Sequence, residues 1–338
     1  MGFGRQPLIE AKCPVNNCFF TDDIDKFNES DVVIFFIQYM YDFPDYRFPN
    51  QRFVFYELDS PANTKSYPFT NNHTRYNYFN WTMTHRLDSD IVQRDIYGAI
   101  VPKPSAHLPE IYPESLYSMS DGRDGGRSRR QTKPSPLYLR RPKSDSDVWR
   151  GKTKLVAWFA SHCPTPIRRE EYVRQLSQYV QVDVYGKCGN MTTCGNDEKC
   201  LQLLRTDYKF YLSFENSWCP DYVTEKFYRP LLYDTVPIVL GGVDYDQFAP
   251  PHSYINAFDF PSAKELAEYL HLLDRNEDLY ARYFDWKRHY EVIASPKNGW
   301  CELCQMADDP KLPAKIYPDI KRWWEDGSQC LFNSFEYF

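Results

Sequence analysis

The residues best suited to chemistry lie in a polar loop and a helix start between two predicted strands, at 208–214 and 236–240. The helix is predicted to begin at Thr224, a good N-cap residue, with Glu225 in its first turn. In open α/β sheets, ligands bind beyond the carboxyl ends of the strands, where this loop falls. A helix N-terminus beside Lys226 suits a phosphate, and Glu225 suits sugar hydroxyls. We therefore expect a site for a nucleotide that carries phosphate and ribose.

A longer polar pattern runs through the same segment. Its members are Glu215, Asn216, Ser217, Asp221, Tyr222, Thr224, Glu225, Lys226, Val236, Pro237 and Gly241. In order and spacing they resemble the signature of the α1,3-fucosyltransferases, and the resemblance extends over residues 28–116 and 151–330. It implies an α/β fold of the GT-B type, with two Rossmann-like domains facing across a cleft. It also implies inverting transfer of fucose from GDP-fucose to a sugar hydroxyl.

The resemblance implies donor-binding roles for five side chains of this segment. Lys226 and the helix N-terminus would neutralise the diphosphate of GDP-fucose. Glu225 would accept hydrogen bonds from the ribose hydroxyls, and Tyr222 would line the nucleotide pocket. Asn216 would bond the sugar or the phosphate, with Ser217 beside it.

A second cation is expected from residues 161–172, which resemble the family segment that carries a donor-binding arginine. Arg168 and Arg169 are both candidates, because a guanidinium fork suits phosphate oxygens. Arg169 is preferred. Tyr185 and Gly186 end a predicted strand on the guanosine side of the family site. Of these two, Tyr185 is expected to pack rather than to contact the donor.

The general base is expected in the first domain, within the segment FYELDSPAN at residues 55–63. Family members commonly carry a glutamate directly before the Ser-Pro pair, where this chain has Asp59. Glu57 lies about where some bacterial relatives have their base. Strand alternation points both carboxylates to one face, so the pattern leaves both open. Burial should raise the pKa of the true base, and an inverting transfer needs only one.

A third block, with Arg86, Asp88, Ser89 and Asp90, resembles the family pattern RxDSDI. Asp88 and Asp90 mimic a metal-binding DxD motif, but the family needs no metal for its chemistry. We therefore expect no metal site and no cofactor, with GDP-fucose as a co-substrate. Arg86 and Asp88 are expected to shape the acceptor cleft and to join the domains.

The ten cysteines include a CxxC pair, Cys301 and Cys304. The resemblance implies that this pair is bonded to Cys13 and Cys18, which would clamp the two ends of the chain. The connectivity of the other six cannot be deduced from the sequence. They are Cys163, Cys188, Cys194, Cys200, Cys219 and Cys330.

Glycosylation sequons begin at Asn28, Asn72, Asn80 and Asn190. With the cysteines, they favour an oxidising compartment of the secretory pathway. The sequence shows neither a membrane span nor a signal peptide. The resemblance implies a type II Golgi membrane protein with an N-terminal anchor and stem, working in the Golgi lumen, and we expect this sequence to begin inside the stem.

The order of predicted elements divides the 338 residues into four parts. Residues 1–116 are expected to form an acceptor-side domain, and residues 117–150 a linker rich in Ser, Gly and Arg. Residues 151–300 alternate strand and helix, which predicts a parallel, doubly wound donor domain. Residues 301–338 would pack back on the first domain. The net charge of −6 gives no general attraction to nucleic acid.

The resulting hypothesis is an α1,3-fucosyltransferase acting on glycans of glycoproteins or glycolipids. The set of six other cysteines resembles that of invertebrate family members, and with the pair Trp323-Trp324 this resemblance favours the innermost GlcNAc of N-glycans as acceptor. Terminal N-acetyllactosamine, which gives Lewis-type products, is the alternative. A glycan-binding member without activity is a third possibility, supported only by Asp59 in place of glutamate, since the donor-binding set is retained.

Overall fold

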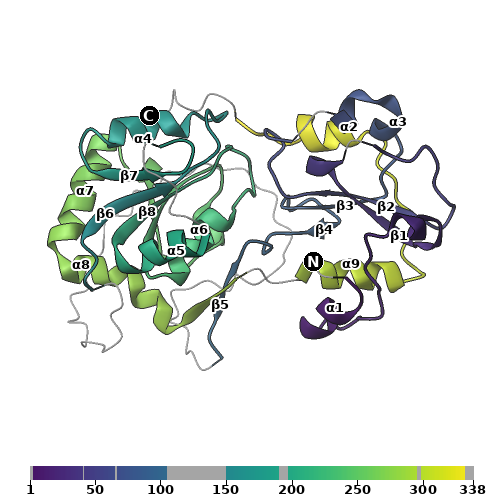
Figure 1. The fold of residues 1–338 in the computed structure, drawn as a ribbon, viewed down its shortest axis with the longest axis horizontal. Helices are drawn as coiled ribbons and strands as arrows, with labels where there is room; N and C mark the ends of the chain where they lie inside the picture. Colours follow the sequence, from purple (N-terminus) through teal and green to yellow (C-terminus); the bar gives the residue numbers. More distant parts are fainter. Residues whose placement is uncertain are drawn as a thin grey trace.

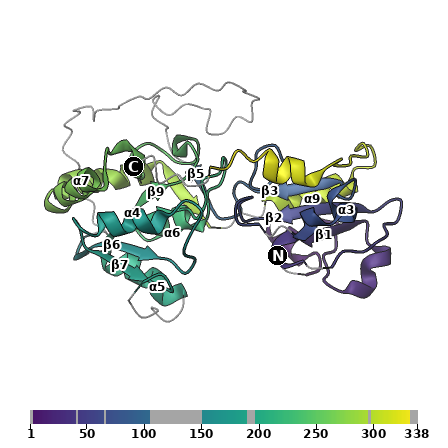
Figure 2. The same ribbon diagram turned by 90° about the horizontal axis from the view of Figure 1, so that it is seen from above.

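The computed structural model describes residues 3–40, 42–64, 67–104, 150–189, 197–294 and 298–331. Two α/β lobes lie side by side, each built on its own parallel sheet (Figures 1 and 2). The predicted fold class, α/β with two Rossmann-like domains, is confirmed. The predicted linker at 117–150 lies outside the described residues except for Arg150.

The first domain has a sheet of parallel strands in the order β1-β2-β3-β4. The strands are β1 (Val32–Phe36), β2 (Arg52–Glu57), β3 (Trp81–Thr84) and β4 (Ile91–Val92). Its helical segments are α1 (Gln6–Glu10), η1 (Ile24–Glu29), η2 (Ile37–Tyr39), α2 (Tyr67–Thr70) and α3 (Asn72–Arg75). Nearly all of β2 is buried, as expected for a parallel strand covered on both faces. The carboxyl ends of these strands therefore form one edge, at which Glu57 lies.

The second domain has a parallel sheet in the order β10-β9-β8-β6-β7. The strands are β6 (Lys154–Phe159), β7 (Val182–Tyr185), β8 (Tyr208–Phe214), β9 (Val236–Leu240) and β10 (Ile255–Asn256). The helical segments are α4 (Arg169–Leu176), α5 (Asp197–Thr206), α6 (Glu225–Leu232), η4 (Tyr245–Gln247), η5 (Ala257–Asp259), α7 (Ala263–Arg275), α8 (Glu277–Ala281) and η6 (Arg282–Arg288). The helix expected over 277–289 is thus a short α-helix that continues as a 3₁₀ segment.

The chain passes between the domains more than once. Strand β5 (Ala99–Pro102) pairs antiparallel with β11 (Tyr290–Ile293), and Ile100 packs in a core cluster of the second domain. The chain has therefore reached the second domain well before residue 116, where the boundary was expected.

The C-terminal segment returns to the first domain. Helix α9 (Asn298–Asp308) lies beneath its sheet in Figure 1, and η7 (Arg322–Asp326) covers another side. Trp324 is fully buried there, in one cluster with Phe35 and Phe53. The first domain is therefore completed by residues from the far end of the sequence.

Disulfide bonds join Cys13 to Cys301 and Cys18 to Cys304, which is the pairing that the resemblance implied. Two further bonds join Cys163 to Cys188 and Cys219 to Cys330. No cysteine among the described residues is free, and Cys194 lies outside them. None of the described helices is both long and apolar enough to span a bilayer.

Candidate active site

The carboxyl end of β2 carries a buried carboxylate, Glu57, which has no exposed surface. Its Oε1 accepts hydrogen bonds from the backbone N–H groups of Leu58 and Asp59, both at 2.9 Å. Its Oε2 is buried and has no hydrogen-bond partner among the described residues. Burial raises the pKa of Glu57 to about 7, against the opposing effect of these N–H groups. Such a group can accept a proton near neutral pH.

The second base candidate, Asp59, has a different environment. Because β2 ends at Glu57, strand alternation does not extend to Asp59, and the expectation that both carboxylates share a strand face is wrong. Oδ1 of Asp59 accepts hydrogen bonds from the Ser60 N–H and the Tyr222 hydroxyl, both at 2.8 Å. This oxygen is therefore already engaged with the second domain.

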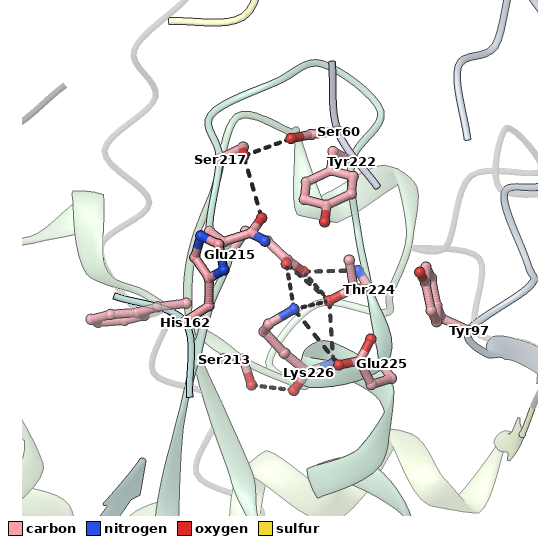
Figure 3. Close-up of polar contacts among 12 residues, drawn as sticks. Ser60, Tyr97, His162, Ser213, Glu215, Ser217, Tyr222, Thr224, Glu225 and Lys226 are labelled. Atoms are coloured by element: carbon pink, nitrogen blue, oxygen red, sulfur yellow. Dashed lines mark hydrogen bonds and ion pairs between the residues drawn. The ribbon is translucent and has the colours of Figure 1, made fainter. Parts of the chain in front are cut away.

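We call residues 215–223, between β8 and the N-cap of α6, the donor loop. It starts with Glu215, a fully buried carboxylate (Figure 3). Its Oε1 accepts hydrogen bonds from the backbone N–H of Thr224 at 2.8 Å and from its hydroxyl at 3.0 Å. Burial raises the pKa of Glu215, while Lys226 opposes this rise. Thr224 is the N-cap of α6, as predicted. Glu215 therefore holds the loop against the start of the helix.

Lys226 lies among carboxylates in Figure 3. Its Nζ donates to Thr224 Oγ1 at 2.8 Å and to Glu215 Oε2 at 3.3 Å, and lies 3.7 Å from Glu225 Oε1. Burial tends to raise the pKa of Glu225, but Lys226 and Arg229 outweigh it, and the net pKa is lowered. Glu225 is thus an ionised acceptor for hydroxyls. Lys226 therefore lies in the first turn of α6, and its ammonium group partly neutralises the charges of Glu215 and Glu225.

Of the two arginines, Arg169 is buried and reaches the carboxyl end of β8. Its guanidinium donates to the carbonyl oxygens of Phe214 and His162, while its Nε is buried without a partner in the described structure. Arg168 is exposed and has a positive φ of 53° as the residue before α4. Arg169 is therefore the member of the pair that the fold brings to the sheet edge.

The end of β7 places Tyr185 and Gly186. The Tyr185 hydroxyl lies 2.7 Å from that of Tyr208, and the ring is buried, so this residue packs in the core. Gly186 has φ of 95°, and a Cβ there would lie 2.5 Å from the carbonyl oxygen of Ala160. Glycine is required for β7 to end this close to β6.

Arg86 and Asp88 form a bidentate ion pair with both distances at 2.8 Å. Arg86 also donates to the backbone of Trp323 and Trp324, and the indole N–H of Trp323 donates to Asp88. Asp90 accepts from the hydroxyl of Tyr317 at 2.9 Å. These side chains attach the C-terminal segment to the first domain. No group of side chains able to hold a metal ion occurs in the described part of the chain.

Sequence reasoning missed His85, which is buried after β3. Its ring lies edge-on to Tyr222 at 5.0 Å and to Trp324 at 5.6 Å. Burial lowers its pKa to about 3, so the imidazole is neutral. Sequence reasoning also missed Asn63, which reaches the second domain. No local pattern marks either residue, because their neighbours come from distant parts of the chain.

Comparisons with known proteins point in one direction. Residues 149–323 match the model for the C-terminal part of glycosyltransferase family 10 (fucosyltransferase), and residues 3–96 match the model for the fucosyltransferase N-terminal region. Alpha-(1,3)-fucosyltransferase C of Drosophila melanogaster is 35% identical, over 93% of this chain and 71% of its own length. Glycoprotein 3-alpha-L-fucosyltransferase A of the same organism is 33% identical, over 99% of this chain.

The chain spans 60% of the length of that second relative. Human Alpha-(1,3)-fucosyltransferase 4 is 35% identical over 82% of this chain and 46% of its own length. A crystal structure of an α1,3-fucosyltransferase with GDP-fucose matches 83% of this chain and 79% of its own, with a TM-score of 0.49 and 18% sequence identity.

Proposed function

Because the chain belongs to glycosyltransferase family 10, the fucosyltransferases, we propose that it transfers L-fucose from GDP-fucose, in α1,3 linkage, to GlcNAc of a glycan. The observation that carries this proposal is Glu57, a fully buried carboxylate with a raised pKa and an unpartnered oxygen. It lies at the sheet edge where α/β domains bind their ligands.

In the proposed reaction, the buried Glu57 Oε2 becomes accessible when the acceptor binds, and it accepts the proton of the acceptor hydroxyl. The acceptor oxygen attacks C1 of fucose, the bond from C1 to the phosphate oxygen breaks, and GDP leaves. A single displacement inverts the configuration at C1 and needs no covalent intermediate. Glu57 is preferred over Asp59 because burial raises the pKa of Glu57 to about 7, which suits a base that works near neutral pH.

The donor is held by groups of the second domain. Arg169 and Lys226 supply positive charge, and the N-terminus of α6 supplies N–H groups, for the diphosphate. Glu225 accepts from the ribose, and Asn216 bonds the sugar or phosphate. These cations make a divalent metal unnecessary in the proposed chemistry, so a chelator should leave the rate unchanged.

We propose the innermost GlcNAc of protein N-glycans as the acceptor. Its support is the name of one relative, Glycoprotein 3-alpha-L-fucosyltransferase A. Terminal N-acetyllactosamine is the alternative, supported by a Bos taurus relative named 3-galactosyl-N-acetylglucosaminide 4-alpha-L-fucosyltransferase FUT3. The proposed compartment is the Golgi lumen, with an N-terminal membrane anchor, because its oxidising chemistry permits the disulfide bonds.

The test is a transfer assay with protein purified from a secretory host. GDP-fucose is supplied with a core-exposed N-glycan or with free N-acetyllactosamine, with and without EDTA, and products are identified by mass spectrometry. Fucose on the core GlcNAc supports the full proposal, and fucose only on N-acetyllactosamine supports the alternative acceptor. Binding of GDP-fucose without transfer to either acceptor would favour a glycan-binding protein without activity.

A further inference from the structure

The loop after β2 and the loop after β8 share hydrogen bonds across the two domains. Ser60 Oγ donates to Ser217 Oγ at 2.6 Å, and Asn63 Nδ2 donates to the same oxygen at 2.9 Å. The Tyr222 hydroxyl donates to Asp59 Oδ1 at 2.8 Å. Figure 3 shows Ser60 of the first domain against Ser217, with Tyr222 alongside. We call these five residues the cross-domain contact.

The cross-domain contact is largely buried. Ser60 and Ser217 have no exposed surface and Tyr222 is 3% exposed, while Asp59 and Asn63 are half-buried. Burial raises the pKa of Tyr222 well above its usual range, so the phenol keeps its proton and donates it to the Asp59 carboxylate. A buried hydrogen bond to a charged group contributes more than an exposed one, and leaving its acceptor unpaired is costly.

The same short loop holds Glu57. The N–H groups of Leu58 and Asp59 both donate to Glu57 Oε1, while the side chain of Asp59 is held by Tyr222. A shift of Asp59 therefore moves the backbone that orients the Glu57 carboxylate. Tyr222 lies in the donor loop, two residues before the N-cap of α6. Its position is therefore coupled to that of the proposed donor-binding residues.

We propose that Tyr222 is a positioning residue whose hydroxyl, reaching across from the donor domain, fixes the orientation of Glu57. Alignment of Glu57 then depends on the position of the donor loop. This inference rests on the proposed function and assigns Tyr222 a second role, beside the expected lining of the nucleotide pocket. The Tyr222 hydroxyl is occupied by Asp59, and its ring packs on His85.

The test is Tyr222→Phe, which keeps the ring and removes the hydroxyl. We expect kcat to fall by roughly tenfold to a hundredfold, because small misplacements of reacting groups are costly. The readouts of this role are kcat and the pH–rate profile rather than KM for GDP-fucose, because the role acts through Glu57. The N–H groups of Leu58 and Asp59 lower the pKa of Glu57, so a loosened loop should move the acid limb of the pH–rate profile to higher pH.

Tyr78→Phe is the matched control. Tyr78 is also buried, and its hydroxyl donates to the Pro44 carbonyl at 2.9 Å, ahead of β3 and away from the sheet edge that carries Glu57. The Tyr78→Phe variant removes a buried hydroxyl and should leave kcat and the pH–rate profile unchanged. Ser217→Ala, which loses the contacts to Ser60 and Asn63, is the second test variant if Tyr222→Phe does not fold.

The outcomes separate the two proposals. A lower kcat with a shifted acid limb in Tyr222→Phe supports the positioning role, and the same result in Ser217→Ala supports alignment of Glu57 by the cross-domain contact as a whole. An unchanged kcat would overturn it, as would a higher KM for GDP-fucose with an unshifted pH profile. If the wild-type protein transfers no fucose, the proposed function itself fails, whatever the variants do.

Discussion

Burial and neighbouring charges set the pKa values of the ionisable residues of the site. Glu57 has no exposed surface, and its pKa is raised to about 7, whereas the pKa of Glu225 is lowered by Lys226 and Arg229 despite burial. The two glutamates thus differ in pKa because their surroundings differ, which suits the proposed tasks of accepting a proton for Glu57 and remaining an anion for Glu225. The sequence places both residues but not their surroundings.

The raised pKa of Glu57 also affects stability. Between pH 4.5, the usual pKa of a glutamate, and about pH 7, Glu57 holds a proton in the folded protein that it has lost in the unfolded chain. The free energy of unfolding therefore falls as pH rises through this range. The Glu57→Gln variant lacks this effect and should be more stable than wild type at pH 8, by about 3 kcal/mol. Urea unfolding at pH 5 and pH 8 measures this, and an equal pH dependence in both proteins would contradict it.

Lys226 stabilises the fold, in addition to the donor contact that we propose for it. Lys226→Ala leaves the buried Glu215 carboxylate without its ammonium, which should cost on the order of 3 kcal/mol. The double variant Lys226→Ala/Glu215→Gln removes the stranded charge and should recover much of this stability. Thermal unfolding measures the effect on stability, and titration calorimetry with GDP measures the effect on binding. GDP should bind more weakly than to wild type in both variants, although only the single variant is strongly destabilised. Unchanged GDP affinity would refute the phosphate assignment.

Among the helices, α6 depends on its N-cap residue, Thr224. Thr224 caps the helix through its side chain, and it also gives Glu215 a backbone and a hydroxyl donor. Thr224→Ala should therefore destabilise the protein by about 2 kcal/mol, at the upper end for a lost cap. Thr224→Ser keeps the hydroxyl and serves as the control in thermal unfolding. Equal stability of the alanine and serine variants would show that the cap is unimportant.

Local patterns located the elements of the second domain but not the pairing of distant ones. The strands β6, β7, β8 and β9 follow from apolar runs bounded by polar or glycine positions. The β5–β11 pair joins residues far apart in sequence, and its short strands carry no distinctive pattern. Propensity alone also does not show where an α-helix becomes a 3₁₀ segment, as after α8.

The site was predictable to the extent that it is contiguous. The donor loop and the N-cap Thr224 are one stretch of sequence. The contact of Asp59 with Tyr222 was not predictable, since it forms only when the domains meet. Arg86 was expected in the acceptor cleft, and its attachment to the C-terminal segment likewise depends on tertiary structure. The sequon at Asn80 is another case, because this residue is buried and donates to the Lys315 carbonyl.

Two disulfide bonds clamp the ends of the whole molecule. Cys13–Cys301 and Cys18–Cys304 close loops with separations of 288 and 286 residues, so either bond alone constrains the unfolded chain almost fully. Breaking one of them, as in Cys13→Ser/Cys301→Ser, should therefore cost little. Breaking both should cost about 2–5 kcal/mol. Denaturant unfolding of the single-bridge and no-bridge variants tests this, and equal, additive losses would contradict it.

The domains themselves are joined by more than the chain. Besides the cross-domain contact, the backbone N–H of Leu87 donates to Asp221 Oδ2 at 3.1 Å. The donor loop is thus contacted by the segments that follow β2 and β3, and the Cys219–Cys330 bond ties the C-terminal segment to it as well. This arrangement places the proposed base and the donor-binding residues in one structural unit.

The most direct test of Glu57 as the base is the pH–rate profile of fucose transfer by wild type, Glu57→Gln and Asp59→Asn. We expect the wild-type rate to rise with pH through about 7, as Glu57 loses its proton. Glu57→Gln should lose on the order of a hundredfold or more and show no such limb. Asp59→Asn should retain the limb with a smaller loss. A large loss in Asp59→Asn together with a near-normal rate in Glu57→Gln would contradict the assignment and make Asp59 the base.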